Sequence, residues 1–94
     1  MPSHSREDTP LQRLGATIRH YRRQRKLSQK ALAALSGCDT SYLSGIEQGK
    51  RNVSALLLLR IAQSLQIPVS HLMAPLDEFS SARGTQEQDV SENN

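Results

Sequence analysis

The stretch that decides the fold is SQKALAALSGCDTSYLSGI, residues 28–46. Ser28 and Asp39 are residue types that commonly cap helix N-termini, and each precedes a run in which apolar residues recur at helical spacing. Between the two runs, Gly37 stands where a left-handed residue commonly ends a helix. Two short helices joined by a tight turn are therefore predicted, which is the pattern of a helix-turn-helix over residues 28–48.

Each of the two predicted helices has an inward and an outward face. The apolar spacing directs four side chains toward the core: Leu32, Leu35, Leu43 and Ile46. The outward face of the helix expected over residues 40–48 then has small polar side chains, those of Thr40, Ser41 and Ser44. Short side chains on an outward face suit a helix that enters a DNA major groove, which is about 12 Å wide.

The segment before this motif predicts a longer helix. Thr9 and Gln12 have the spacing of a capping box, and Pro10 suits the first helical position. Apolar residues then follow at helical spacing, so we expect this helix to run from Pro10 to Arg25.

The segment after the motif predicts two more helices. Ser54 is expected to cap one of them, and Pro68 to end it, because proline cannot continue a helix. Ser70 is expected to cap a short helix that continues through Met73 and stops at Pro75. The expected fold is therefore all-α, a compact domain of five helices.

The two ends of the chain differ in composition from the middle. Residues 1–8 are polar and aperiodic and are expected to form a flexible arm, whereas residues 9–75 form the folded domain. Residues 76–94 are rich in Ser, Gln, Asn and acidic residues, a composition typical of a disordered tail.

The charge is distributed unevenly along the chain. The chain of 94 residues has a formal net charge of +3, yet residues 11–75 contain ten Lys and Arg against two acidic residues, a net of +8. Residues 76–94 have a net charge of −4. A folded segment this basic favours a polyanionic partner, although an ordinary solvated basic face is the alternative.

Composition and spacing argue against several other classes of protein. A single cysteine, Cys38, and the lack of a signal peptide indicate a reducing, cytoplasmic location. No apolar run approaches the roughly 18 residues that span a membrane, so no membrane association is expected. The three histidines have no ligand-like spacing, and no nucleophile–base pair or glycine-rich phosphate loop is present. We therefore expect no metal, no cofactor and no enzymatic activity.

Residues 14–73 closely resemble the Xre/lambda-repressor-like family of helix-turn-helix regulators. The resembling stretches are LGATIR at 14–19, LSQ at 27–29, LA at 32–33, IEQGKRNVS at 46–54 and IAQSL at 61–65. Each stretch is weak alone, but their order and spacing are specific. The run YLSGIEQGKRNVS, residues 42–54, is especially similar to controller proteins of restriction-modification systems, and it occurs in looser form in stand-alone regulators of the family.

This resemblance implies a sequence-specific transcriptional regulator and assigns roles to individual residues. The positions that read base edges in the family are Thr40, Ser41 and Ser44, flanked by Tyr42. The positions that bind DNA phosphates are Gln29, Gln48, Lys50, Arg51 and Asn52. Arg22 and Glu47 match a buried salt bridge between the first and third helices. Gly45 stands where some relatives have a long base-reading side chain, so base contacts are expected to be sparse.

Several of these residues also have a purely structural interpretation. Thr40 and Ser41 also suit the first turn of any helix, and Gln29 could be a plain surface residue. Tyr42 could stack on the sugar-phosphate edge or pack on a neighbouring helix. Cys38 is read as a small apolar residue in the turn rather than as a redox sensor, because no basic residue adjoins it in sequence to lower its pKa.

A single reading helix spans only a few base pairs, so we expect a homodimer on a (pseudo)palindromic operator with half-sites about one helical turn apart. The candidate interface residues are Leu56, Leu57, Val69, His71, Met73 and Leu76. A wider core contact is the alternative for this set. A rival function is that of an antitoxin-like or protein-interaction module, whose acidic tail would bind a protein partner.

Overall fold

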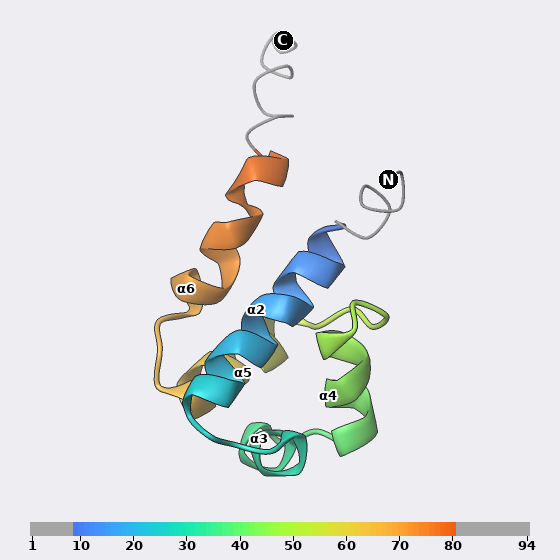
Figure 1. Ribbon diagram of the computed structural model, residues 1–94, viewed down its shortest axis with the longest axis vertical. Coiled ribbons are helices and arrows are strands. Elements are labelled where there is room, and N and C mark those ends of the chain that lie inside the picture. The colour runs from blue at the N-terminus through green and yellow to red at the C-terminus, as the bar shows by residue number, and fades with distance from the viewer. Residues whose placement is uncertain (1–8, 81–94) are drawn as a thin grey trace, which may run out of the picture.

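The computed structural model describes residues 9–80 of the chain. Within these residues the fold is all-helical, with five α-helices and one short 3-10 helix (Figure 1). The helices are α2 (Pro10–Gln24), α3 (Gln29–Ser36), α4 (Thr40–Glu47), α5 (Ala55–Leu65) and α6 (Val69–Met73), followed by η1 (Ala74–Leu76). α2 contacts α4 on one side and α6 with η1 on the other, and α5 packs on α3. This confirms the expected all-α fold of five helices.

The start of α2 has the predicted capping box. Thr9 Oγ1 accepts a hydrogen bond from the Gln12 backbone N–H at 3.1 Å, and Gln12 Oε1 accepts one from the Thr9 N–H at 3.2 Å. The helix ends at Gln24, one residue before the expected end, and Arg25 is its C-terminal cap.

The two helices of the motif lie where the sequence predicts them, with one error. Ser28 Oγ accepts from the Ala31 N–H at 3.0 Å, and Gly37 ends α3 in the left-handed region with φ of 77°. Leu35, expected to face inward, is instead 61% exposed. The adjacent Ser36 faces the core in its place, where its hydroxyl bonds that of Ser64 in α5 at 3.2 Å.

α4 begins after Asp39 as predicted, although the Asp39 side chain makes no capping hydrogen bond. The helix ends at Glu47 rather than at Gln48. Gly49 follows in the left-handed region, with φ of 76°.

The role of Pro68 differs from the prediction. Ser54 caps α5 as expected, accepting from the Leu57 N–H at 3.1 Å, but the helix ends at Leu65. Gln66 adopts a left-handed conformation with φ of 60° and ends α5 before the proline is reached. Pro68 is instead the N-terminal cap of α6, the position that we had expected Ser70 to occupy.

The helical path also continues past the predicted stop at Pro75. This residue lies in the first turn of η1, where its missing N–H is not required, and residues 77–80 are helical. Arg13 holds this extension against α2: its guanidinium bonds the Pro75 carbonyl at 3.2 Å, pairs with Glu78 at 3.1 Å and lies over the Phe79 ring. The first residues of the expected tail therefore belong to the fold. The expected arm, residues 1–8, and residues 81–94 lie outside the described residues.

The core is built from aliphatic side chains of all five helices: Leu14, Ile18, Leu32, Ala33, Leu43, Ile46, Leu58, Ile61, Ala62, Leu65 and Leu72. Gly15 lies where α2 crosses α4. A Cβ built there would be 2.3 Å from the Ile46 carbonyl oxygen and 2.6 Å from that of Glu47. The two helices therefore approach each other at backbone distance, which fixes α4 relative to the rest of the domain.

Candidate nucleic-acid interface

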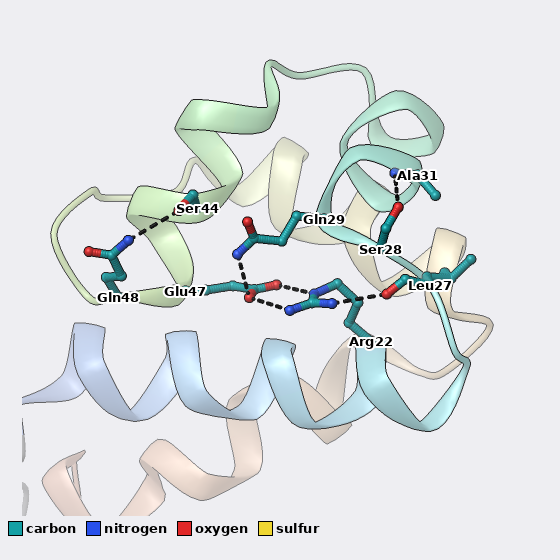
Figure 2. Close-up of polar contacts among 8 residues, drawn as sticks. All are labelled: Arg22, Leu27, Ser28, Gln29, Ala31, Ser44, Glu47 and Gln48. Atoms are coloured by element: carbon teal, nitrogen blue, oxygen red, sulfur yellow. Dashed lines mark hydrogen bonds and ion pairs between the residues drawn. The ribbon is translucent and has the colours of Figure 1, made fainter.

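A buried ion pair joins α2 to the end of α4 (Figure 2). Arg22 Nε donates to Glu47 Oε2 at 2.7 Å and Arg22 Nη2 donates to Glu47 Oε1 at 3.0 Å, so the pair is bidentate. Both residues are buried. Arg22 Nη1 also donates to the Leu27 carbonyl at 2.9 Å. The hydrogen bond with Glu47 raises the pKa of Arg22, against the opposing effect of burial.

Gln29, the first residue of α3, belongs to the same network. Its Nε2 donates to Glu47 Oε1 at 3.0 Å, and the side chain is half-buried (Figure 2). One carboxylate oxygen therefore accepts bonds from both α2 and α3. The sequence predicts separate roles for Gln29 and Glu47, but not this contact between them.

The outward face of α4 is accessible at its N-terminal end. Thr40 and Ser41 are exposed, and within the described residues their hydroxyls make no hydrogen bond. Ser44, one turn further, is half-buried, and its hydroxyl accepts from Gln48 Nε2 at 3.1 Å (Figure 2). Two free hydroxyls thus lie at the start of the helix, and a third is already paired with a candidate phosphate ligand.

The loop after α4 is fixed to the helix by Tyr42. Its hydroxyl donates to the Asn52 carbonyl at 2.6 Å, so the ring spans the space between α4 and the loop. Lys50, Arg51 and Asn52 are all exposed on this loop. The structure therefore places Tyr42 against the following loop, and its contact with the sugar-phosphate edge of DNA stays a prediction.

Gly45 and Arg51 are in close contact. A Cβ built at Gly45 would lie 2.6 Å from Arg51 Cγ, so the aliphatic stem of Arg51 occupies the space that a larger residue at position 45 would need. Sequence reasoning missed this contact. The only signal was a glycine inside a short helix, where it costs about 1 kcal/mol relative to alanine and therefore suggests a close approach.

The candidate interface residues on α5 and α6 divide into two groups. Leu56, Val69 and Met73 are exposed, Leu56 by 58%. Leu57 and Leu76 pack against the core, as the alternative reading holds. His71 is exposed and its ring stacks on that of Tyr21, 6.2 Å between centroids. Leu59, absent from the predicted set, is also exposed.

Other kinds of site find little support within residues 9–80. No group of three or more His, Cys, Asp or Glu residues there could hold a metal ion. Burial and the neighbouring Asp39 raise the pKa of Cys38, which disfavours its thiolate. No single described helix is long and apolar enough to cross a membrane, and α5 reaches that length only when joined to the segment Val69–Ser80 across a bend of 112°.

Comparison with known proteins connects this geometry to a family. Residues 18–72 match the helix-turn-helix family HTH_3. The chain is 35% identical over 65 residues to an uncharacterised HTH-type transcriptional regulator, y4dJ, of Sinorhizobium fredii, covering 69% of this chain and 84% of the relative. It is 37% identical over 67 residues to the control protein C.MunI of a Mycoplasma species, covering 70% and 90%.

Two solved structures extend the comparison. The restriction-modification controller protein C.AhdI of Aeromonas hydrophila superposes with a TM-score of 0.65 at 44% identity, covering 66% of this chain and 94% of the controller. The clp gene regulator ClgR of Corynebacterium glutamicum superposes with a TM-score of 0.72 at 27% identity, covering 87% of each chain. The chain therefore belongs to the Xre/lambda-repressor-like family of helix-turn-helix transcriptional regulators.

Proposed function

We propose that this protein is a sequence-specific regulator that binds operator DNA as a homodimer, with α4 in the major groove. The observation that carries the proposal is the free pair of hydroxyls, Thr40 and Ser41, at the exposed start of α4. The N-terminal residues of a recognition helix are the ones that reach base edges. Hydroxyls donate or accept, so each discriminates less strictly than a bidentate side chain, and the Thr40 methyl adds an apolar contact to thymine.

Phosphate contacts on either side of α4 would fix its orientation. Gln29 begins α3, where free backbone N–H groups attract anions, and its side chain is held beside that helix end by Glu47. Gln48, Lys50 and Asn52 follow α4 and are exposed. Contacts of this kind give register and affinity rather than sequence preference.

Arg51 differs from its neighbours in the loop because its stem lies on α4 at Gly45. The Arg51 guanidinium therefore extends from beside α4, and a guanidinium can donate to a phosphate or to the O6 and N7 atoms of guanine. We infer that Arg51 extends the DNA-contacting surface at the place where Gly45 has no side chain.

Dimerisation would use the apolar side chains exposed on α5 and α6. Leu56 and Leu59 are three residues apart on α5, and Val69 and Met73 are four apart on α6, so each pair lies on one helix face. α5 and α6 contact each other. Two copies joined at this surface would present two reading helices to a symmetric operator.

The test begins with selection of bound duplexes from a random pool, followed by titration of the selected duplex and a scrambled one at several salt concentrations. We expect a symmetric selected sequence, a clear preference for it, and affinity that falls steeply with salt. Sedimentation of the free protein should give a dimer that Leu56→Lys and Leu59→Lys convert to monomer. No enrichment of any duplex would reject the proposal and favour a protein-interaction module.

We further propose that the regulated locus is a restriction-modification system. The 44% identity to C.AhdI and the 37% identity to C.MunI favour this role. Reading the genes beside this one tests it: an adjacent methyltransferase and nuclease would support the role, and an adjacent toxin gene would contradict it.

A further inference from the structure

The basic run from Arg22 to Lys26 separates in the structure into residues with internal partners and residues without. Arg22 pairs with the buried Glu47, and Arg25 Nε donates to the Leu65 carbonyl of α5 at 2.8 Å. Arg23 is exposed, and so is Arg19 one turn earlier on α2. Among the described residues, neither of these two side chains has a hydrogen bond or ion pair.

Arg19 and Arg23 form a stripe on one side of α2. They are four residues apart and are therefore neighbours on the helix surface. Ala16, with its small side chain, is one turn before Arg19 on the same helix, and a shallow hollow of about 560 Å³ is lined by Ala16, Arg19, His20, Arg23 and Gln24. Two unpaired guanidinium groups beside an open hollow are suited to an anion on the outside of the domain.

The position of the stripe relates it to the candidate DNA interface. Arg19 is four residues after Gly15, which packs on the α4 backbone, and three before Arg22, which pairs with Glu47 of α4. The stripe thus adjoins the α2–α4 junction. Gln29 and Gln48, the candidate phosphate ligands, both lie above α2 at this junction (Figure 2).

We propose that Arg19 and Arg23 form a second phosphate-binding site, which contacts the backbone of duplex DNA flanking the bases that α4 reads. The inference rests on the proposed function and extends it. The ligand class is a run of DNA phosphates, because two singly charged guanidinium groups one helical turn apart can each bind one phosphate. The contact adds affinity and lengthens the footprint without adding sequence preference.

The experiment compares Arg19→Gln and Arg23→Gln with Arg60→Gln on two duplexes. One duplex is the sequence selected by the wild-type protein with ten base pairs of arbitrary flank on each side, and the other is trimmed to the selected bases. Arg60 is exposed on α5 and is the matched control, because its replacement removes the same charge elsewhere; since it is four residues after Leu56, sedimentation must first show that Arg60→Gln has the oligomeric state of the wild type. All three changes are at exposed positions, so thermal unfolding should be unaltered.

On the flanked duplex, we expect Arg19→Gln and Arg23→Gln each to weaken binding by roughly two- to fivefold, the range of an exposed ion pair. The slope of log affinity against log salt should become shallower by about 0.9 for each phosphate lost. On the trimmed duplex both variants should bind like the wild type, and Arg60→Gln should do so on both duplexes.

Equal losses for Arg60→Gln, or equal losses on flanked and trimmed duplexes, would overturn the inference, since either result means a general charge effect. An unchanged salt slope would also overturn it. These failures differ from failure of the proposed function, in which the wild-type protein itself would not prefer the selected duplex.

Discussion

Gln29 Nε2 lies 3.0 Å from Glu47 Oε1, so the first side chain of α3 is held by the last residue of α4. The same carboxylate receives two bonds from Arg22. Three helices therefore meet at one buried carboxylate, and the candidate phosphate ligand Gln29 is positioned by the group that anchors α4. Stability and DNA binding are expected to be linked at this point.

Glu47→Ala should lower the free energy of unfolding by about 3–5 kcal/mol, because it leaves the Arg22 guanidinium buried without its partner. Urea unfolding of the two proteins measures the difference. Glu78→Ala is the matched control: Glu78 also pairs with an arginine, but 61% of its side chain is exposed, so its loss should cost less than about 1 kcal/mol. Equal effects of the two changes would show that burial of the Arg22 pair has no energetic consequence.

Gly15→Ala should destabilise the domain by roughly 1–3 kcal/mol, the range of an overpacked core. The added methyl group would meet backbone oxygens of Ile46 and Glu47, which cannot move without displacing α4. The change in unfolding midpoint measures this effect, and DNA binding should weaken as well. A variant as stable as the wild type would mean that α2 and α4 are not in backbone contact at this crossing.

Gly45→Ala should weaken DNA binding without lowering the stability of the domain. The new Cβ would meet the Arg51 stem, which is flexible and can move aside, while alanine improves helix propensity by about 1 kcal/mol. We expect the free energy of unfolding to be unchanged or slightly higher. DNA affinity should fall because Arg51 is displaced. In the Arg51→Ala background, adding Gly45→Ala should have little further effect on DNA affinity. If Gly45→Ala weakens binding as much in that background as in the wild-type protein, the Gly45–Arg51 contact has no role in DNA binding.

Lys50→Ala should weaken binding to all duplexes by a similar factor and reduce the salt slope by about one phosphate. Lys50 is exposed on the loop that Tyr42 holds against α4, and a lysine contacts phosphate as a point charge. Titration of a selected and a scrambled duplex at several salt concentrations tests this. A loss confined to the selected duplex, at an unchanged slope, would indicate that Lys50 reads bases.

The helices could be predicted from the sequence because local chemistry defines their ends. Ser28, Ser54 and Gly37 act within one turn of themselves, and all three behave as predicted. The errors have both non-local and local origins. Ser36, rather than Leu35, lies on the buried side of α3, where its hydroxyl bonds that of Ser64 on α5, a partner that no local pattern contains. Pro68 does not end α5 because Gln66, two residues earlier, already ends it in the left-handed region.

The candidate site likewise combines features that the sequence predicts with contacts that only the three-dimensional arrangement creates. The resemblance to the family predicts the buried Arg22–Glu47 salt bridge, which the structure contains, and a phosphate-binding role for Gln29. The Gln29–Glu47 bond and the Arg51–Gly45 contact depend on how α3, α4 and the following loop are arranged in space, so the sequence alone could not predict them. A tertiary contact likewise distinguishes Arg25, which donates a hydrogen bond to the Leu65 carbonyl, from Arg19 and Arg23.

The central claim is that α4 reads the operator with hydroxyl groups. Thr40→Ala and Ser44→Ala remove two of these groups, and direct readout by a hydroxyl is expected to be worth roughly 1 kcal/mol per base, the weak end of the range. The most direct measurement is the ratio of affinities for the selected and scrambled duplexes at fixed salt, for each variant and the wild type. We predict that the ratio falls about fivefold for Thr40→Ala, and less for Ser44→Ala because its hydroxyl already bonds Gln48, with affinity for scrambled DNA nearly unchanged. A ratio that stays at the wild-type value in both variants would contradict the claim that α4 is the reading helix.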